Sequence, residues 1–230
     1  MTDFMEPMET DGEWISIADL MAALMIVFLF IAIAYIKPLA DEQLRVKEIA
    51  IAWQASEEAI ADALLAEFEG DLTTWGAEFD APTLTIRFKS PDILFGHGKA
   101  LLKTRFRSIL DDFFPRYVAT LARFSEDIAE VRIEGHTSPG WRGVDAHTAY
   151  IRNMELSQAR TRAVLKYAVR PGADGDTPWL RPLLTANGLS SSRPVRDDAG
   201  VEDSIASRRV EFRVRTRTRA EIARILETVS

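Results

Sequence analysis

A long apolar run near the N-terminus, interrupted by one carboxylate, constrains this chain more than any other feature. Residues 15–36 read ISIADLMAALMIVFLFIAIAYI, and no residue from Leu20 to Ile36 is charged. At about 1.5 Å of rise per residue, a helix over this run is roughly 30 Å long, which matches the hydrocarbon core of a bilayer. The pattern predicts one transmembrane helix over residues 15–37, with Asp19 inside it.

Asp19 is costly at that depth. Insertion scales put a buried carboxylate at about 2.5–3.5 kcal/mol, so such residues by default mark an ion or proton path. We interpret Asp19 as an ion carrier, with Ser16 one turn earlier supporting the carboxylate or lining the path. The alternative is an acid at a helix N-terminus that the macrodipole stabilises. A single carboxylate does not distinguish a proton from sodium.

The tail before the run, residues 1–14, carries acids and neither Lys nor Arg. A cleaved signal peptide needs a basic n-region and a shorter apolar core, so we predict a retained single-pass anchor. Lys37, Arg45 and Lys47 follow the run. Taken alone, this count places the C-terminal part in the cytoplasm, since basic residues favour that side of the membrane.

Composition excludes several functions. The 230 residues include no cysteine, which rules out disulfides, thiol catalysis and cysteine-ligated metals. The three histidines are not at metal-ligand spacing. A net charge of −7 argues against nucleic-acid binding, and the chain has no G-x-S-x-G or P-loop motif. We therefore expect no enzyme activity, no metal and no cofactor.

After the apolar run, residues 38–73 read as a helical linker. Pro38 is expected to end or kink the membrane helix, and Gly70 to close the linker. Between them a seam of three- and four-residue steps joins Val46, Ile49, Trp53, Ser56, Ile60, Ala63 and Glu67. Two interpretations stay open: an amphipathic helix that packs on its own domain, or a parallel dimer stalk.

Residues 74–230 read as one domain of alternating helices and strands. Alternation predicts strands at 83–88, 128–136, 182–189 and 208–216, and helical periodicity predicts helices at 99–124, 153–169 and 219–228. The order, with a final strand pair, favours helices on one face of a mixed sheet. The predicted fold class is α+β, with one N-terminal transmembrane helix and a helical linker.

Three segments of this domain resemble the OmpA-like peptidoglycan-binding family: residues 133–138 (IEGHTS), 153–160 (NMELSQAR) and 207–211 (SRRVE). The resemblance implies a site built from Arg160, which would bind a ligand carboxylate, Asn153, which would hydrogen-bond the ligand, and Leu156, which would pack against it. Asn153 is expected at a helix start. Thr137 and Ser138 follow a strand end, where backbone N–H groups can face the ligand.

One position departs from that family. Ser138 stands where the family has an Asp that meets the ligand's amino group, and a serine cannot neutralise an ammonium. For Arg160 the alternative is a surface salt bridge to Glu155 or Glu211. His136, Arg208 and Arg209 are expected to be structural.

One membrane span with an Asp, a linker and an OmpA-like domain is the layout of MotB-type stator subunits. The run around Asp19 and the acidic tail resemble the MotB-like subunits of Zorya anti-phage systems more than flagellar ones. The resemblance implies a homodimer inside a pentamer of a MotA-like channel protein, in the inner membrane. The N-terminus would be cytoplasmic and the domain of residues 74–230 periplasmic. The alternatives are a flagellar-type MotB subunit and a wall tether without ion transport.

Overall fold

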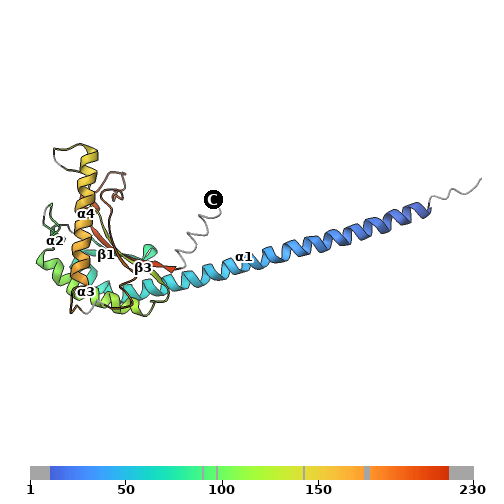
Figure 1. Ribbon diagram of the computed structural model, residues 1–230, viewed down its shortest axis with the longest axis horizontal. Coiled ribbons are helices and arrows are strands. Elements are labelled where there is room, and N and C mark those ends of the chain that lie inside the picture. The colour runs from blue at the N-terminus through green and yellow to red at the C-terminus, as the bar shows by residue number, and fades with distance from the viewer. Residues whose placement is uncertain (1–10, 90, 97, 142, 174–176, 218–230) are drawn as a thin grey trace, which may run out of the picture. The chain divides into compact units, whose positions relative to one another are not determined.

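The computed structural model describes residues 11–89, 91–96, 98–141, 143–173 and 177–217, without the side chains of 11–16, 19, 37–53, 91 and 92. The chain divides into two compact units, Met1–Ala52 and Trp53–Ser230. The first described element is α1 (Asp11–Trp75), the long helix of Figure 1. The second unit holds the sheet and the remaining helices.

The apolar run predicted to cross a membrane lies in α1. The described side chains between residues 17 and 36 are all exposed, and almost all of them are apolar. Among the described residues, no helix combines the length and the apolar character needed to cross a membrane. The span over residues 15–37 therefore stays a prediction.

The helix does not end where the sequence suggested. It continues through Pro38 and Gly70 and ends at Trp75. The next residue, Gly76, has φ of +64° and its N–H bonds to Thr73 O at 3.2 Å, as glycines do after a helix end. Gly70 has open space around it and imposes no turn. The predicted linker, residues 38–73, is therefore part of the single helix α1.

The last turns of α1 belong to the core of the second unit. Ile60, Leu64 and Phe68 are buried, and the Phe68 ring lies 5.2 Å from Phe113 of α3 (Thr104–Ala122). The end of the helix therefore packs on its own domain, although through Leu64 and Phe68 in place of the predicted Ala63 and Glu67, which are half-buried. The dimer stalk stays a prediction, because the side chains of the seam up to Trp53 lie outside the described set.

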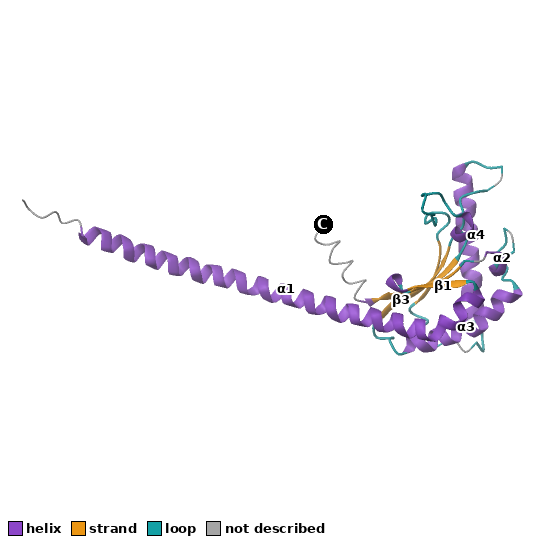
Figure 2. Ribbon diagram, turned by 180° about the vertical axis from the view of Figure 1, so that it is seen from behind, coloured by secondary structure: helices purple, strands orange, loops and turns teal. Residues whose placement is uncertain are grey.

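The strands, orange in Figure 2, form one sheet, and their order in it is β1-β2-β5-β3-β4. Its strands are β1 (Ala77–Asp80), β2 (Thr85–Phe88), β3 (Ile128–Gly135), β4 (Leu184–Gly188) and β5 (Val210–Thr216). Only the β3–β4 pair is parallel, so the predicted mixed sheet is confirmed. The predicted final strand pair is wrong, because β4 and β5 flank β3 on opposite sides. Sequence reasoning also missed β1.

The other helical segments are η1 (Ala81–Thr83), α2 (Pro91–Leu94), α4 (Ala146–Ala168) and α5 (Ser204–Ser207). The helix predicted at 219–228 lies outside the described residues. The sheet presents an apolar face toward the helices: Ile86, Phe212 and Ile133 lie side by side across β2, β5 and β3, and all three are fully buried. Charged side chains fill the alternate positions.

Helix α4 crosses the sheet where two glycines face each other, Gly135 of β3 and Gly188 of β4. A Cβ added at Gly188 would lie 2.3 Å from the backbone nitrogen of Gln158, and one at Gly135 would lie 2.6 Å from a methyl of Thr161. The two glycines therefore set how closely α4 approaches the sheet.

We expect Gly188→Ala to lower the free energy of unfolding by about 1–3 kcal/mol, because the backbone of α4 would have to move away. Urea unfolding of the full-length chain, followed by tryptophan fluorescence, measures the change. The matched control is Gly70→Ala, at an exposed helix position with open space, which should raise the same free energy by about 0.5–1 kcal/mol. An unchanged midpoint for Gly188→Ala would contradict the close approach.

Candidate ligand-binding site

Arg160 of α4 is buried and has no counter-charge among the described residues. It is 9% exposed, its Nε donates to the carbonyl oxygen of Lys99 at 3.0 Å, and its guanidinium carbon lies 4.9 Å from the ring centroid of Phe95. Neither contact neutralises it, and within the described part of the chain no ion pair joins it to a carboxylate. The alternative of a salt bridge to Glu155 or Glu211 is therefore not what the described residues show.

The surroundings of Arg160 are positive. Burial, and after it the positive charge of Arg208, lower the pKa of Arg160 to about 10. At neutral pH the group is still protonated, and a buried charge without a partner costs free energy. A strongly perturbed, uncompensated group is typical of a site where a ligand supplies the counter-charge. The two terminal nitrogens suit a carboxylate, which guanidinium holds bidentately.

Asn153 does not start its helix. α4 begins earlier, at Ala146, and Asp145 caps it by accepting the Thr148 N–H at 3.0 Å. Asn153 lies two turns inside the helix and is 3% exposed. Its Nδ2 donates to Ser138 O at 3.0 Å and more weakly to Pro139 O at 3.4 Å. It therefore holds the loop after β3 against the face of α4 that carries Arg160.

The remaining predicted binding residues lie around that loop. Thr137 is buried and its N–H donates to Ser190 O at 2.9 Å. This N–H therefore does not face a ligand, contrary to the prediction. Its hydroxyl oxygen is buried and has no hydrogen-bond partner among the described residues. Ser138 and Leu156 are half-buried. The structure thus places Ser138 and Asn153 in contact.

Asp19 and Ser16 lie in α1, and their side chains are outside the described set. Their proposed role in ion transport stays a prediction.

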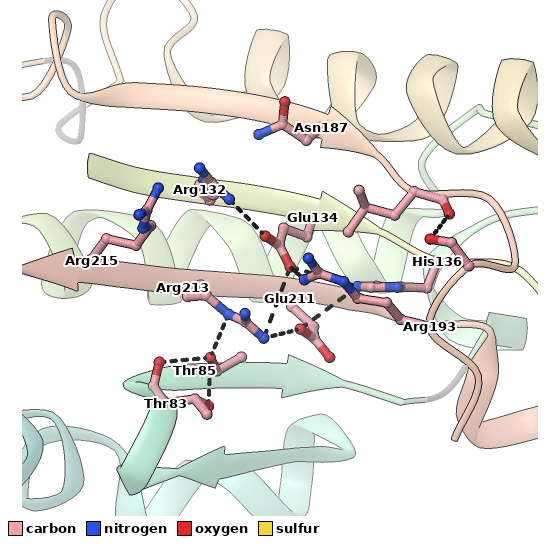
Figure 3. Close-up of polar contacts among 12 residues, drawn as sticks. Thr83, Thr85, Arg132, Glu134, His136, Asn187, Arg193, Glu211, Arg213 and Arg215 are labelled. Atoms are coloured by element: carbon pink, nitrogen blue, oxygen red, sulfur yellow. Dashed lines mark hydrogen bonds and ion pairs between the residues drawn. The ribbon is translucent and has the colours of Figure 1, made fainter. Parts of the chain in front are cut away.

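A second cluster covers the polar face of the sheet (Figure 3). We call it the charged ladder; it comprises Glu78, Arg87, Glu130, Arg132, Glu134, Arg193, Arg209, Glu211, Arg213 and Arg215. Glu134 of β3 lies directly opposite Glu211 of β5, and Arg132 lies opposite Arg213. Like charges that face each other across strands destabilise a sheet. Here Arg213 offsets both glutamates, at 3.2 Å from Glu211 and 3.9 Å from Glu134.

Between the two glutamates lies His136, which is 2% exposed. Its Nε2 is 3.6 Å from Glu211 and 3.9 Å from Glu134, and burial lowers its pKa. The three side chains each offer a ligand atom within 4.8 Å of the others. A dication there would be repelled by the surrounding guanidinium groups of the charged ladder, so the residues do not fit a metal. The expected structural role of His136 and Arg209 agrees with this geometry.

Comparison with known proteins identifies the family of this chain. The chain is 47% identical over 222 residues to Zorya protein ZorB of Escherichia coli, which covers 95% of this chain and 94% of that protein. The chain belongs to the ZorB family. No protein-family model matches it.

Solved structures resemble this ZorB-family chain in fold. A putative MotB-like protein from Desulfovibrio vulgaris is 25% identical and has a TM-score of 0.50, covering 74% of this chain and 98% of that chain. The cell wall anchor of the T6SS from Pseudomonas aeruginosa is 22% identical with a TM-score of 0.47, covering 66% of this chain and 96% of that chain.

Sequence reasoning missed three contributors to the site of this ZorB-family chain. Phe95 and the carbonyl of Lys99 position Arg160 from a loop more than sixty residues away, and no local pattern signals that contact. Arg208, expected to be structural, contributes positive charge at Arg160. The resemblance of residues 207–211 to a binding family was the available signal for Arg208.

The charged ladder supports a prediction on pH. Burial alone would raise the pKa of the Glu211 carboxyl, but the contact with His136 and the charges of Arg209 and Arg87 outweigh it and hold the pKa well below the usual range. The stability that ionised Glu211 contributes is fully present above its unfolded pKa, about 4.3, and is lost as the pH falls toward the folded pKa.

We expect Glu211→Gln to lower the free energy of unfolding at pH 7 by about 3–5 kcal/mol, because the buried Arg209 and the half-buried Arg87 and Arg213 lose their charged partner. The variant should also lose less stability than wild type between pH 4.5 and the acid limit. Urea unfolding at pH 7, 4 and 3 measures both. Glu155→Gln, at an exposed position of α4, should change stability by less than about 0.5 kcal/mol. Equal losses for the two variants would refute the assigned role.

Proposed function

We propose that this chain is the MotB-like, cell-wall-anchored subunit of an ion-driven membrane motor in anti-phage defence. The observation that carries the wall-binding half is the buried, uncompensated guanidinium of Arg160. Membership of the ZorB family supports the defence role, and the fold shared with a MotB-like protein supports the stator-like layout.

The membrane anchor is the apolar stretch of α1. Its described side chains from Leu20 to Ile36 are exposed, and at about 1.5 Å per residue the stretch is roughly 25 Å long, close to a bilayer core. Apolar side chains exposed on such a scale need a partner or a lipid environment. We place the N-terminus in the cytoplasm and the unit Trp53–Ser230 in the periplasm, against the Lys and Arg count, because a wall-binding site has its ligand there.

Asp19 is the proposed ion carrier, with Ser16 as its neighbour in the path. Its partners in this proposal are a MotA-like channel subunit of the ZorA type, which forms a pentamer, and a second copy of this chain. The ring would shield Asp19 from lipid, as an intramembrane carboxylate requires.

In the wall-binding site, Arg160 holds a carboxylate of the peptidoglycan stem peptide. Asn153 fixes the loop at Ser138 and contacts the ligand, Leu156 packs against it, and Thr137 anchors the loop. The competing proposal is a wall tether in which Asp19 has no part in ion transport.

The two proposals separate at Asp19→Asn, which keeps size and polarity but removes titration. We expect the variant to lose phage protection and ion flux while its amount in the inner membrane stays unchanged. Plaque counts and flux across vesicles that contain the partner subunit measure the effect. If protection and flux survive Asp19→Asn while Arg160→Ala abolishes protection, the tether stands and the motor does not.

Wall binding has a separate test. The full-length chain in detergent should sediment with purified peptidoglycan sacculi, and Arg160→Ala should weaken this binding about tenfold or more, since a charge-assisted hydrogen-bond pair is lost. The matched control is Arg162→Ala, which removes the same charge from an exposed position on the same helix and should sediment as wild type does. Equal sedimentation of both variants would refute the site.

A further inference from the structure

Among the described residues, the charges at the Arg160 site are positive and no acidic side chain is bonded to Arg160. We propose that this site selects a carboxylate alone and does not read an ammonium group beside it, so it binds stem peptides whether their neighbouring amine is free or acylated. This inference rests on the proposed wall-binding function and specifies the ligand of that same site.

The cationic side of the site is well defined. Arg160 is nine-tenths buried, its only hydrogen bond among the described residues uses Nε, and Arg208 lies close enough to act on its charge. The stacking partner Phe95 is neutral. A ligand that reaches the terminal nitrogens therefore meets two positive charges.

Among the described residues, the stretch of loop that Asn153 binds supplies no acid. The loop that Asn153 holds contributes Ser138 and Pro139, and neither carries a charge. The acid that feels the charge of Arg208 is Asp203, and its carboxylate already accepts the N–H groups of Ile205 and Ala206 at 2.8 and 3.0 Å. Among the described residues, no hydrogen bond or ion pair joins a carboxylate to Arg160 or to the loop at Ser138 and Pro139.

Two further acids belong to α4 and its N-cap, and among the described residues no hydrogen bond or ion pair joins either of them to Arg160 or Ser138. Asp145 caps the helix through Thr148, and Glu155 is exposed on another face of the helix than the buried Asn153 and Arg160. The glutamates of the charged ladder are paired with arginines. An ammonium bound at the site would gain no ion pair and would be repelled by the guanidinium groups.

A site that does not require a free amine can bind more of the stem peptides in the cell wall. In a stem peptide, the amine of a diamino acid such as diaminopimelate is free in an uncrosslinked stem and acylated in a crosslinked one. A site that reads only the carboxylate accepts both, so it has more positions available in a crosslinked wall.

The test uses synthetic tripeptide stems that end in diaminopimelate, titrated into the full-length chain in detergent by calorimetry. One peptide has its side-chain amine and both carboxylates free, and a second has that amine acetylated. Two more have either the side-chain carboxylate or the main-chain carboxylate amidated, which identifies the carboxylate that binds.

We expect acetylation to change Kd by less than about threefold, since no ion pair is lost. Amidation of the bound carboxylate should weaken binding about tenfold or more, because the charge-assisted hydrogen bonds to Arg160 disappear. These comparisons change the ligand and leave the protein intact, so they do not depend on whether an Arg160 variant folds.

A gain-of-selectivity variant gives the second readout. Ser138→Asp places a carboxylate beside the loop that Asn153 holds, and it should make the free amine preferred over the acetylated one by about two- to fivefold. Ser138→Asn has nearly the same shape without the charge and should leave the two peptides equal.

The outcomes separate the inference from the function. A wild-type preference of tenfold or more for the free amine would overturn the inference while wall binding stands. Sedimentation with sacculi but no response to any of the four peptides would also overturn the inference. Failure to bind both sacculi and peptides would overturn the proposed wall-binding function itself.

Discussion

The second unit depends on the placement of β5 in the centre of the sheet, because successive residues of this strand serve opposite faces. Phe212 points into the core, where its ring lies 4.9 Å from Phe113 and 5.9 Å from Phe88. Glu211, its neighbour, is buried on the other face among arginines. A slip of one residue in register would bring the glutamate into the aromatic core and the phenylalanine among the charges, so both faces specify the same register.

That register also positions the candidate site. The ends of β3 and β4 place Gly135 and Gly188 under α4, where side chains would collide with Thr161 and Gln158. The Ser190 N–H then donates to the hydroxyl of Ser157 at 3.0 Å, which ties the loop after β4 to the same turn of the helix. Arg160 lies on the next turn, so its position follows from backbone contacts and does not depend on the ligand. Such preorganisation reduces the free-energy cost of binding.

Much of this fold could be predicted from local pattern. The alternation around Phe212 predicted β5, and the apolar periodicity around Phe113 and Val164 predicted α3 and α4. The failures have physical causes. β1 is short and half-buried on a sheet edge, so it has little alternation to detect. Asn153 was expected to cap a helix because the two helical turns before it were not recognised, whereas Asp145 makes the cap. The motif resemblance indicated Arg160, but its contacts with Phe95 and Lys99 depend on tertiary packing.

Two buried charges within the same unit, Glu211 and Arg160, differ in how they are paired. This contrast marks Arg160 as the candidate binding residue without reference to relatives. Glu211 is 1% exposed and has three guanidinium groups within 3.2 Å, those of Arg87, Arg209 and Arg213. Arg160 is 9% exposed and has no carboxylate among the described residues. Folding alone favours the first arrangement, because an unpaired buried charge costs free energy that a pair recovers. Glu211 has several guanidinium partners, whereas Arg160 has no carboxylate partner among the described residues. Stability does not explain an unpaired buried arginine, so its explanation lies in function. In the proposed wall-binding function, a carboxylate ligand would supply that reason, since its charge would give Arg160 the pairing that Glu211 already has.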